Sequence, residues 1–246
     1  MPAADPRLIV ALDFSTRAEA EVLLGKLGDA ASSFKIGYQL FYGGEGLEIG
    51  KQLIAAGKQV FFDLKLLDID NTVEKGVAAI AETGAHMMTV HAYPKAMRAA
   101  VRAAEGSHLR LLGVTVLTSM DDEDLEEAGY DRDVESLVAL RTHQATDAGM
   151  GGIVCSAHEA ALASQFVGED MAIVTPGIRP RGSDQGDQKR IVTPAEALSL
   201  GATHLVVGRP ITQAPSPAQE AGAILSEMAS APLPGAHAHH HHHHHH

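Results

Sequence analysis

The sequence contains a single cysteine, Cys155. One cysteine cannot form an intramolecular disulfide, and such scarcity is typical of a reducing compartment. No apolar run reaches the roughly 18 residues that a membrane-spanning helix needs. The chain also does not begin with a cationic segment followed by an apolar one, so we expect no signal peptide. These absences predict a soluble, cytoplasmic protein that does not bind a membrane.

Basic residues are also few: 19 Lys and Arg stand against 31 Asp and Glu, which gives a formal net charge of −12. This balance argues against a nucleic-acid partner, which would require clustered basic residues. It leaves an anionic small substrate open, because the local charge of a site can oppose the global charge.

Histidine is abundant chiefly because the chain ends in a tract from His239 to His246. We interpret residues 236–246 as an expression tag and leave them out of fold and metal arguments. Residues 1–235 then form one domain, since about 250 residues is ordinary for a single α/β barrel.

Short apolar runs rich in β-branched residues recur along the chain, and helical spacing fills the segments between them. Continuous rather than alternating apolar runs indicate parallel strands buried on both faces. Eight β-then-α units favour a closed barrel over an open doubly wound sheet, so the predicted fold is α/β, a single-domain (β/α)8 TIM barrel. The predicted strands are Leu8–Asp13, Ser33–Gly37, Gln59–Asp63, Met87–His91, Leu111–Leu117, Gly152–Cys155, Met171–Thr175 and His204–Gly208.

Helix boundaries have their own signals. Ser15 or Thr16 is a candidate N-cap for the first helix. Asn71 can cap a helix that begins at Thr72, in the manner of a capping box. The acidic stretch Met120–Asp133 predicts a longer loop with a helical turn. Four glycines follow helical runs, where a left-handed cap favours glycine: Gly57, Gly84, Gly149 and Gly201.

Charged residues mark the carboxyl ends of the predicted strands, where barrels of this kind carry their active sites. Asp63 ends the third strand and Lys65 lies two residues beyond it, so strand geometry points both side chains to the same side. Lys35, on the neighbouring strand, can approach them. An array of alternating charge tolerates burial. A structural ion-pair network is the alternative, but several such residues at the strand ends of one barrel favour a functional site.

The residue types at this site suit a decarboxylation. A carboxylate next to a substrate carboxylate raises the ground-state energy by repulsion, which is relieved when CO2 leaves. A neighbouring lysine can stabilise the developing carbanion and then protonate it. Asp63 and Lys65 together supply both groups.

The pattern Asp-x-Lys-x-x-Asp-Ile-x-Asn-Thr, from Asp63 to Thr72, resembles the signature of orotidine 5′-monophosphate decarboxylases. This resemblance implies conversion of orotidine 5′-monophosphate (OMP) to UMP and CO2 in de novo pyrimidine biosynthesis, without a cofactor or a metal. Six further segments resemble the family in the same order: Val10–Asp13, Phe34–Gly37, Val116–Ser119, Thr175–Pro180, Asp187–Arg190 and Val207–Ile211.

The resemblance also implies roles for individual residues. Lys65 would protonate C6 of the pyrimidine, and Asp63 would be the carboxylate that stresses the substrate carboxylate. Lys35 would complete the charge array and reach the ribose, Asp13 would hold a ribose hydroxyl, and Thr118 would lie near the pyrimidine or its flanking loop.

Three residues of the same signature are implied to act across a subunit interface. In the family, the equivalents of Asp68, Ile69 and Thr72 reach into the partner's site. The chain is therefore expected to form a homodimer with two shared active sites.

The substrate phosphate is expected at the end of the eighth strand. Gly208 allows close backbone approach there, and Arg209 can hold two phosphate oxygens. The segment Pro176–Arg190 is rich in glycine, proline and polar residues. A plain turn and a surface loop are the alternatives. Beside Gly208, the segment is better interpreted as a lid whose Arg179 and Gln188 close onto the phosphate.

The sequence departs from the family pattern at Leu66-Leu67, where an aromatic-histidine pair is usual, and at Asp70, which replaces a proline. Hexulose-phosphate synthases and keto-gulonate-phosphate decarboxylases share Asp-x-Lys-x-x-Asp, but carry a glutamate for Mg²⁺ where Lys35 stands, so this lysine favours the orotidine family. A catalytically inactive barrel with a nucleotide-binding or assembly role is a further alternative.

The remaining candidate residues are interpreted as structural or stay open. Cys155 is expected to be a buried small hydrophobe, and His91 either lines the barrel mouth or is structural. The other untagged histidines show no ligand spacing, and we predict no catalytic metal: His86, His108, His143, His158 and His204.

Overall fold

The computed structural model describes residues 3–180 and 192–231. Gln188 and the tag at 236–246 lie outside the described residues. Eight parallel strands close into a barrel, because β1 pairs with β2 on one side and with β8 on the other. The strands are β1 (Leu8–Ala11), β2 (Ser33–Ile36), β3 (Gln59–Leu66), β4 (Met87–His91), β5 (Arg110–Val114), β6 (Gly152–Val154), β7 (Ala172–Thr175) and β8 (His204–Val207). The predicted (β/α)8 barrel is confirmed.

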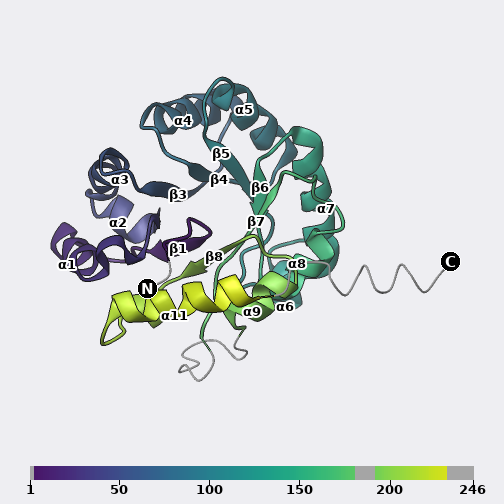
Figure 1. Cartoon of the computed structure of the whole chain (residues 1–246). Coiled ribbons are helices and arrows are strands. Elements are labelled where there is room, and N and C mark those ends of the chain that lie inside the picture. The colour runs from purple at the N-terminus through teal and green to yellow at the C-terminus, as the bar shows by residue number, and fades with distance from the viewer. Residues whose placement is uncertain (1–2, 181–191, 232–246) are drawn as a thin grey trace.

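Helices surround the barrel, as Figure 1 shows for α1 to α9 and α11 around the central strands. The first group comprises α1 (Arg17–Leu27), η1 (Gly28–Ala30), α2 (Tyr38–Tyr42), α3 (Gly46–Ala55), α4 (Asp70–Glu82) and α5 (Pro94–Ala104). The second comprises α6 (Asp122–Glu127), α7 (Val134–Ala148), α8 (Ala157–Ala163), α9 (Pro194–Ser199), α10 (Arg209–Thr212) and α11 (Pro217–Ser230). None of the helices in the described residues combines the length and apolar character that a membrane crossing requires.

Strand alternation divides the core into two layers. One set of buried residues packs between the strands and the helices, including Val10, Phe34 and Phe62. The other set fills the inside of the barrel, and Ile9 and Phe61 belong to it. Since side chains two apart in a strand share a face, a residue two positions after Phe61 points into the barrel near its carboxyl end.

Helix caps agree with the sequence predictions at most positions. The Thr16 side chain accepts from the backbone N–H of Glu19 and caps α1. Gly149 ends α7 in the left-handed conformation, with φ 81°. The predicted helical turn after the fifth strand is α6. The other three predicted glycines also have positive φ: Gly57, Gly84 and Gly201.

The predicted cap at Asn71 is wrong. Helix α4 begins at Asp70, with Ile69 at the N-cap position and no side-chain capping bond. Asn71 therefore lies inside the first turn, where its own backbone is helical and its side chain is not at the capping position.

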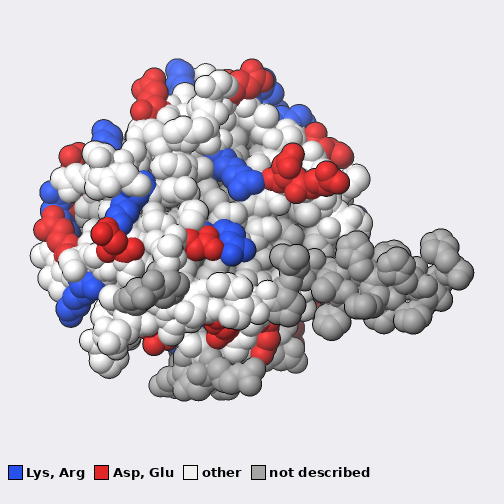
Figure 2. Space-filling model, in the orientation of Figure 1, with Lys and Arg blue, Asp and Glu red and all other residues white. Residues whose placement is uncertain are grey.

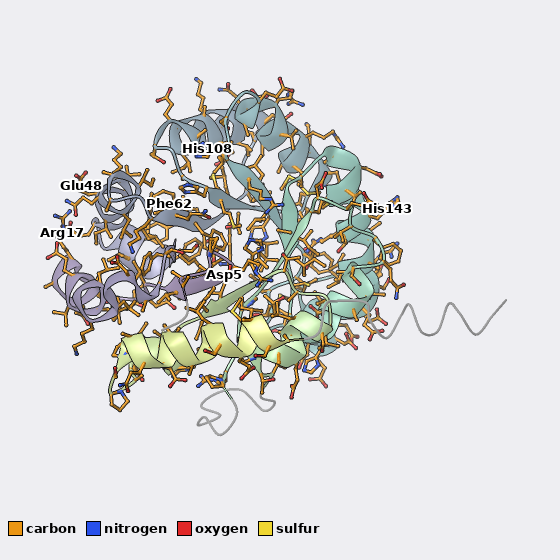
Figure 3. The ribbon with its side chains drawn as sticks, viewed as in Figure 1. Asp5, Arg17, Glu48, Phe62, His108 and His143 are labelled. Atoms are coloured by element: carbon orange, nitrogen blue, oxygen red, sulfur yellow. The ribbon has the colours of Figure 1, made fainter. Side chains whose placement is uncertain are left out.

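The view of Figures 1 to 3 looks onto the end of the barrel where the strands begin. Asp5, which precedes β1, lies near the centre of the ring in Figure 3. On this face, basic and acidic side chains are interspersed (Figure 2). The carboxyl ends of the strands, where the predicted site lies, are at the opposite end.

Candidate active site

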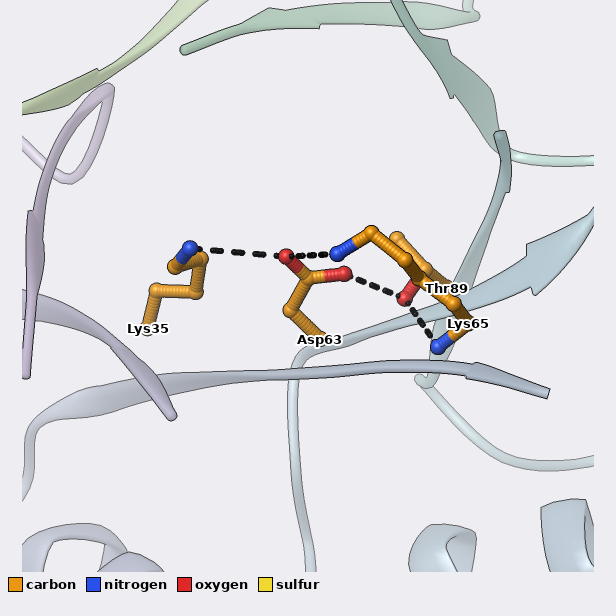
Figure 4. A network of polar contacts seen from close by, with 4 residues as sticks. All are labelled: Lys35, Asp63, Lys65 and Thr89. Carbon is orange, nitrogen blue, oxygen red and sulfur yellow. Dashed lines mark hydrogen bonds and ion pairs between the residues drawn. The ribbon is translucent and has the colours of Figure 1, made fainter. Parts of the chain in front are cut away.

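Asp63 lies between two lysines at the carboxyl end of the barrel (Figure 4). Its Oδ2 is 2.8 Å from Nζ of Lys65 and 3.4 Å from Nζ of Lys35. Asp63 is buried, and its side chain retains 11% exposure against 17% for Lys35 and 26% for Lys65. The structure thus brings these three predicted residues into one array, in which the lysine side chains are more exposed than the aspartate.

Thr89 completes the contacts of the same carboxylate. Its hydroxyl donates to Oδ1 of Asp63 at 2.7 Å and accepts from the backbone N–H of Lys65 at 2.9 Å. Thr89 is fully buried in β4. Its residue type does not distinguish it in the sequence, because a threonine in an apolar run is an ordinary strand residue. Its position two residues before His91 on the same face was the only available signal.

The environment of Asp63 favours its ionised form. Burial is the largest single influence and would raise the pKa of the carboxyl. The charges of Lys35 and Lys65 and the hydrogen bonds from Lys65 and Thr89 together outweigh it, so the pKa lies below its usual value. The Asp63 carboxylate is therefore ionised at neutral pH.

Lys65 reaches Asp63 by a different route from the one predicted. Strand β3 continues to Leu66, and its pairing with β4 is irregular between Phe62 and Leu66. Lys65 has φ 46°, a left-handed conformation that no other non-glycine residue among the described ones adopts. Such a conformation costs about 1–3 kcal/mol. Regular strand alternation is therefore not what aims this ammonium group.

Tyr38, at the start of α2, also touches the array. The Lys65 ammonium lies 5.5 Å from the centre of the Tyr38 ring, within the range of a cation–π contact. The Tyr38 side chain is exposed. Sequence reasoning missed this residue, because nothing in its local pattern indicates a contact with β3.

His91 ends β4 beside the array and is half-buried. Its pKa is lowered by burial first, and then by the positive charges of Arg141 and Lys65, which outweigh the opposite effect of Asp63. At neutral pH the ring is therefore uncharged and can donate or accept a hydrogen bond. It lines the mouth, which was one of the two interpretations left open.

The predicted ribose and phosphate residues lie on neighbouring strand ends. Asp13 is exposed just after β1, and a Cβ on Gly208 would be 3.9 Å from its Oδ2. Arg209 is exposed and begins α10 directly after β8. These three residues therefore form a second polar group on the β1–β8 side of the mouth.

Arg179 follows β7 and is held by the backbone. Its N–H donates to the carbonyl of Val192 at 3.0 Å, and Ile178 pairs with Val192 in an isolated parallel bridge. The described residues on the two sides of positions 181–191 therefore lie next to each other. Gln188, its other predicted phosphate contact, lies outside the described residues.

The loop after β3 and the first turn of α4 carry the remaining signature residues. Asp68, Ile69 and Thr72 are exposed, and Ile69 reaches 71%. The Asp68 carboxylate accepts from the N–H of Ile69 at 2.7 Å, and among the described residues it forms no ion pair with the two lysines. The structure does not bring these residues into the array of the same chain. Asp68 and Ile69 line an open groove of about 650 Å³ together with Leu67, Asp70, Asn71, Tyr93, Lys95 and Ala96.

Two further sequence-selected residues are placed by the structure. Thr118 is exposed in the turn after β5, which ends at Val114 rather than at the predicted Leu117. Cys155 is fully buried, and burial raises the pKa of its thiol, as expected of a small core residue. Within the described residues, no three His, Cys, Asp or Glu side chains are grouped as metal ligands.

Comparison with known proteins gives one family. A family model described as Orotidine 5′-phosphate decarboxylase / HUMPS family matches residues 6–224. The chain is 35% identical to the crystal structure of orotidine 5′-phosphate decarboxylase from Lactobacillus acidophilus, with a TM-score of 0.81 over 92% of this chain and 100% of that one. It is 34% identical to an uncharacterized conserved protein from Geobacillus kaustophilus, with a TM-score of 0.78 over 90% and 99%. The similarity includes every strand that carries the array.

Proposed function

Since the chain belongs to the Orotidine 5′-phosphate decarboxylase / HUMPS family, we propose that it converts orotidine 5′-monophosphate to UMP and CO2 without a cofactor. The observation that carries this proposal is the buried, ionised Asp63 carboxylate between the ammonium groups of Lys35 and Lys65. The reaction is a step of pyrimidine nucleotide biosynthesis.

In the proposed mechanism, Asp63 raises the energy of the bound substrate, and Lys65 stabilises and protonates the carbanion that forms when CO2 leaves. The substrate carboxylate is placed beside the Asp63 carboxylate, whose pKa is already lowered, so neither charge is easily neutralised. The bond from C6 to the carboxylate carbon breaks, CO2 leaves, and the electron pair stays on C6. The Lys65 ammonium stabilises this carbanion, transfers a proton to C6 and is reprotonated from solvent.

The remaining predicted residues bind the two other parts of the substrate. Asp13 and Lys35 would hold the ribose hydroxyls, and Thr118 would contact the base. Gly208, Arg209, Arg179 and Gln188 would hold the phosphate. Binding energy from the phosphate is available to hold the pyrimidine against Asp63, which is how remote groups increase the rate of a chemical step.

We also propose a homodimer in which each site is completed by the other subunit. Ile69 is 71% exposed, an unusual state for a large apolar side chain, and lies beside exposed Leu67. Asp68 is exposed on the same loop, and Thr72 is exposed in the first turn of α4. A second copy packed on this loop would bury the apolar residues and receive Asp68 near its own Lys65.

The deciding experiment is a turnover assay with purified protein. We expect loss of the near-ultraviolet absorbance of orotidine 5′-monophosphate, at a rate that EDTA does not reduce. Lys65→Ala should lower kcat by at least about a thousandfold, because it removes both the proton donor and the stabilising cation. No turnover by the unmodified chain, or turnover that requires added Mg²⁺, would refute the assignment. The second result would favour the magnesium-dependent members of the family.

A further inference from the structure

Arg141 is a buried cation outside the array described above. It lies on α7 and is 9% exposed. One terminal nitrogen donates to the carbonyl of Thr115, and the other donates to the hydroxyl of Tyr130 at 3.2 Å. Among the described residues no carboxylate forms an ion pair with it. A buried guanidinium without a carboxylate is costly unless other groups stabilise its charge.

Two tyrosine rings provide that stabilisation. The guanidinium carbon lies 4.9 Å from the centre of the Tyr93 ring and 5.4 Å from that of Tyr130. Both distances are within the range of a cation–π contact, which gains strength when water is excluded. The two tyrosine hydroxyls are 2.9 Å apart. We call Tyr93, Tyr130 and Arg141 the tyrosine–arginine clamp.

The clamp joins three segments that are distant in sequence. Tyr93 lies in the turn between β4 and α5, Tyr130 follows α6, and Arg141 belongs to α7. Through Thr115, the clamp also reaches the residue after the last position of β5. The Thr115 hydroxyl donates to the carbonyl of Val154 at 2.9 Å, which ties this point to β6 as well.

The segment between Thr115 and Tyr130 shares a small core with α7. Val116 and Leu125 of the segment pack with Leu137 and Val138 of α7, and partly buried Met120, Tyr130 and Val134 join them. The exposed turn that contains Thr118 projects from this packed segment. Its position relative to the barrel is therefore set by Arg141 and the core together.

We propose that Arg141 is a positioning residue for the pyrimidine end of the substrate. Through Thr115 and Tyr130, it fixes the β5–α6 segment so that Thr118 meets the base. This inference rests on the proposed function, which places the base near Thr118. The clamp also holds Tyr93, whose ring lies 6.3 Å from that of His91 at the site edge. The clamp thus acts on the side of the mouth away from the phosphate residues of β8.

The test compares two ligands that share the ribose phosphate. Titration calorimetry measures the affinity of the full chain and of Arg141→Met for each ligand. UMP has the base, whereas ribose 5-phosphate lacks it. We expect UMP binding to weaken by about tenfold or more and ribose 5-phosphate binding to change by less than about twofold. Equal weakening of both ligands, or no change in either, would overturn the inference, since a general loss of structure does not discriminate between them.

A double-mutant cycle tests whether Arg141 acts through Thr118. kcat/KM is measured for Arg141→Met, Thr118→Ala and the double variant. The double variant should lose little more than the worse single variant, because residues that act as a unit are not additive. Multiplied losses would contradict action through Thr118. Arg102→Met is the matched control, since Arg102 is an exposed arginine on α5 paired with Glu74 at 3.0 Å.

Milder variants keep the test decisive if Arg141→Met does not fold. Tyr130→Phe keeps the ring but removes the oxygen to which Arg141 donates, and should show the same selective loss of UMP affinity to a smaller degree. Arg141→Lys should not restore UMP affinity, because one ammonium group cannot reproduce the planar, two-sided contact. Full rescue by lysine would overturn the proposal. Absence of OMP turnover by the unmodified chain would instead refute the proposed function itself.

Discussion

Both carboxylate oxygens of Asp63 are engaged, but by groups of different kinds. Oδ2 faces the ammonium groups of Lys35 and Lys65, whereas Oδ1 accepts from the hydroxyl of Thr89, which lies on the buried β4 strand. The same hydroxyl accepts from the backbone N–H of Lys65. One neutral side chain therefore orients the carboxylate and fixes the irregular end of β3.

Thr89→Val tests this residue, because it keeps the shape and removes both hydrogen bonds. We expect a loss of about 1–3 kcal/mol in the free energy of unfolding, since a buried acceptor is left without its donor. kcat/KM should fall by about tenfold, because the carboxylate is no longer fixed. Thr89→Ser keeps the hydroxyl and should retain most of the unfolding free energy and most of kcat/KM.

Thr175→Val is the matched control in a denaturant titration. Thr175 is also a fully buried strand threonine, but its hydroxyl has no hydrogen-bond partner among the described residues. Its replacement by valine should leave stability unchanged or raised. Equal losses of unfolding free energy in Thr89→Val and Thr175→Val would contradict the role given to the Thr89 hydroxyl.

The lowered pKa of Asp63 makes part of the stability depend on pH. A carboxyl with a lowered folded pKa contributes stability above its unfolded pKa of about 3.9, and this contribution is lost as the pH falls through the folded value. Asp63→Asn should therefore have a lower Tm than the unmodified chain at pH 7, and the difference should shrink below about pH 4. Thermal unfolding from pH 7 to pH 3 measures it. A difference in Tm that does not shrink between pH 4 and pH 3 would contradict this account, and Asp68→Asn controls for the loss of one carboxylate.

The charged members of the site were predictable because charge at a strand end is conspicuous against an apolar run. Lys35, Asp63 and Lys65 were found in this way. Thr89 was not, since its residue type fits the strand without a function. Arg141 was not found either, because its importance comes from contacts with Thr115 and Tyr130 that depend on tertiary packing.

At the scale of elements, the beginnings of helices and the ends of strands differ in how well sequence predicts them. Most strands were placed to within a residue or two, but β3 runs on to Leu66 because an irregular pairing with β4 allows it. Backbone φ at Lys65 is decided by that pairing and by Thr89, neither of which is local in sequence. Caps are local, so Thr16 was identified, yet Asn71 shows that the capping residue type alone is insufficient.

Two alanine substitutions separate a true cap from a false one. Thr16→Ala should cost about 1 kcal/mol of unfolding free energy, since it removes the acceptor for the N–H of Glu19. Asn71→Ala should change stability by less than about 0.5 kcal/mol, because its side chain caps nothing in α4. Urea titrations at one protein concentration compare them. If Asn71→Ala lowered the free energy of unfolding as much as Thr16→Ala, Asn71 would be a helix cap after all.

At the scale of the molecule, the closed barrel was predictable because eight apolar runs with intervening helices leave few other architectures. No comparable sequence pattern predicts the association of subunits. Exposed Ile69 and Leu67 indicate an apolar surface suited to an interface, but only a second copy of the chain would bury it. The proposed dimer therefore needs a direct test.

Mixing two inactive variants provides that test. Lys65→Ala and Asp68→Ala, combined under conditions that allow subunit exchange, should recover about a quarter of the original activity, because half of the dimers are hybrids with one intact site of two. Lys65→Ala mixed with Asp63→Ala should recover nothing, since both residues belong to one chain's array. No recovery in the first mixture, with exchange verified by mass, would exclude Asp68 from the partner's site.

The pairing of Ile178 with Val192 also indicates where this barrel can accept insertions and deletions during evolution. The chain departs and returns at neighbouring points, so the number of residues inserted between them does not alter the spacing of β7 and α9. Closure of a longer excursion is cheap, at about 0.6 kcal/mol for each doubling of length. We expect insertions and deletions to accumulate there and the barrel to tolerate them, which leaves this position free to be adapted to substrates of different size.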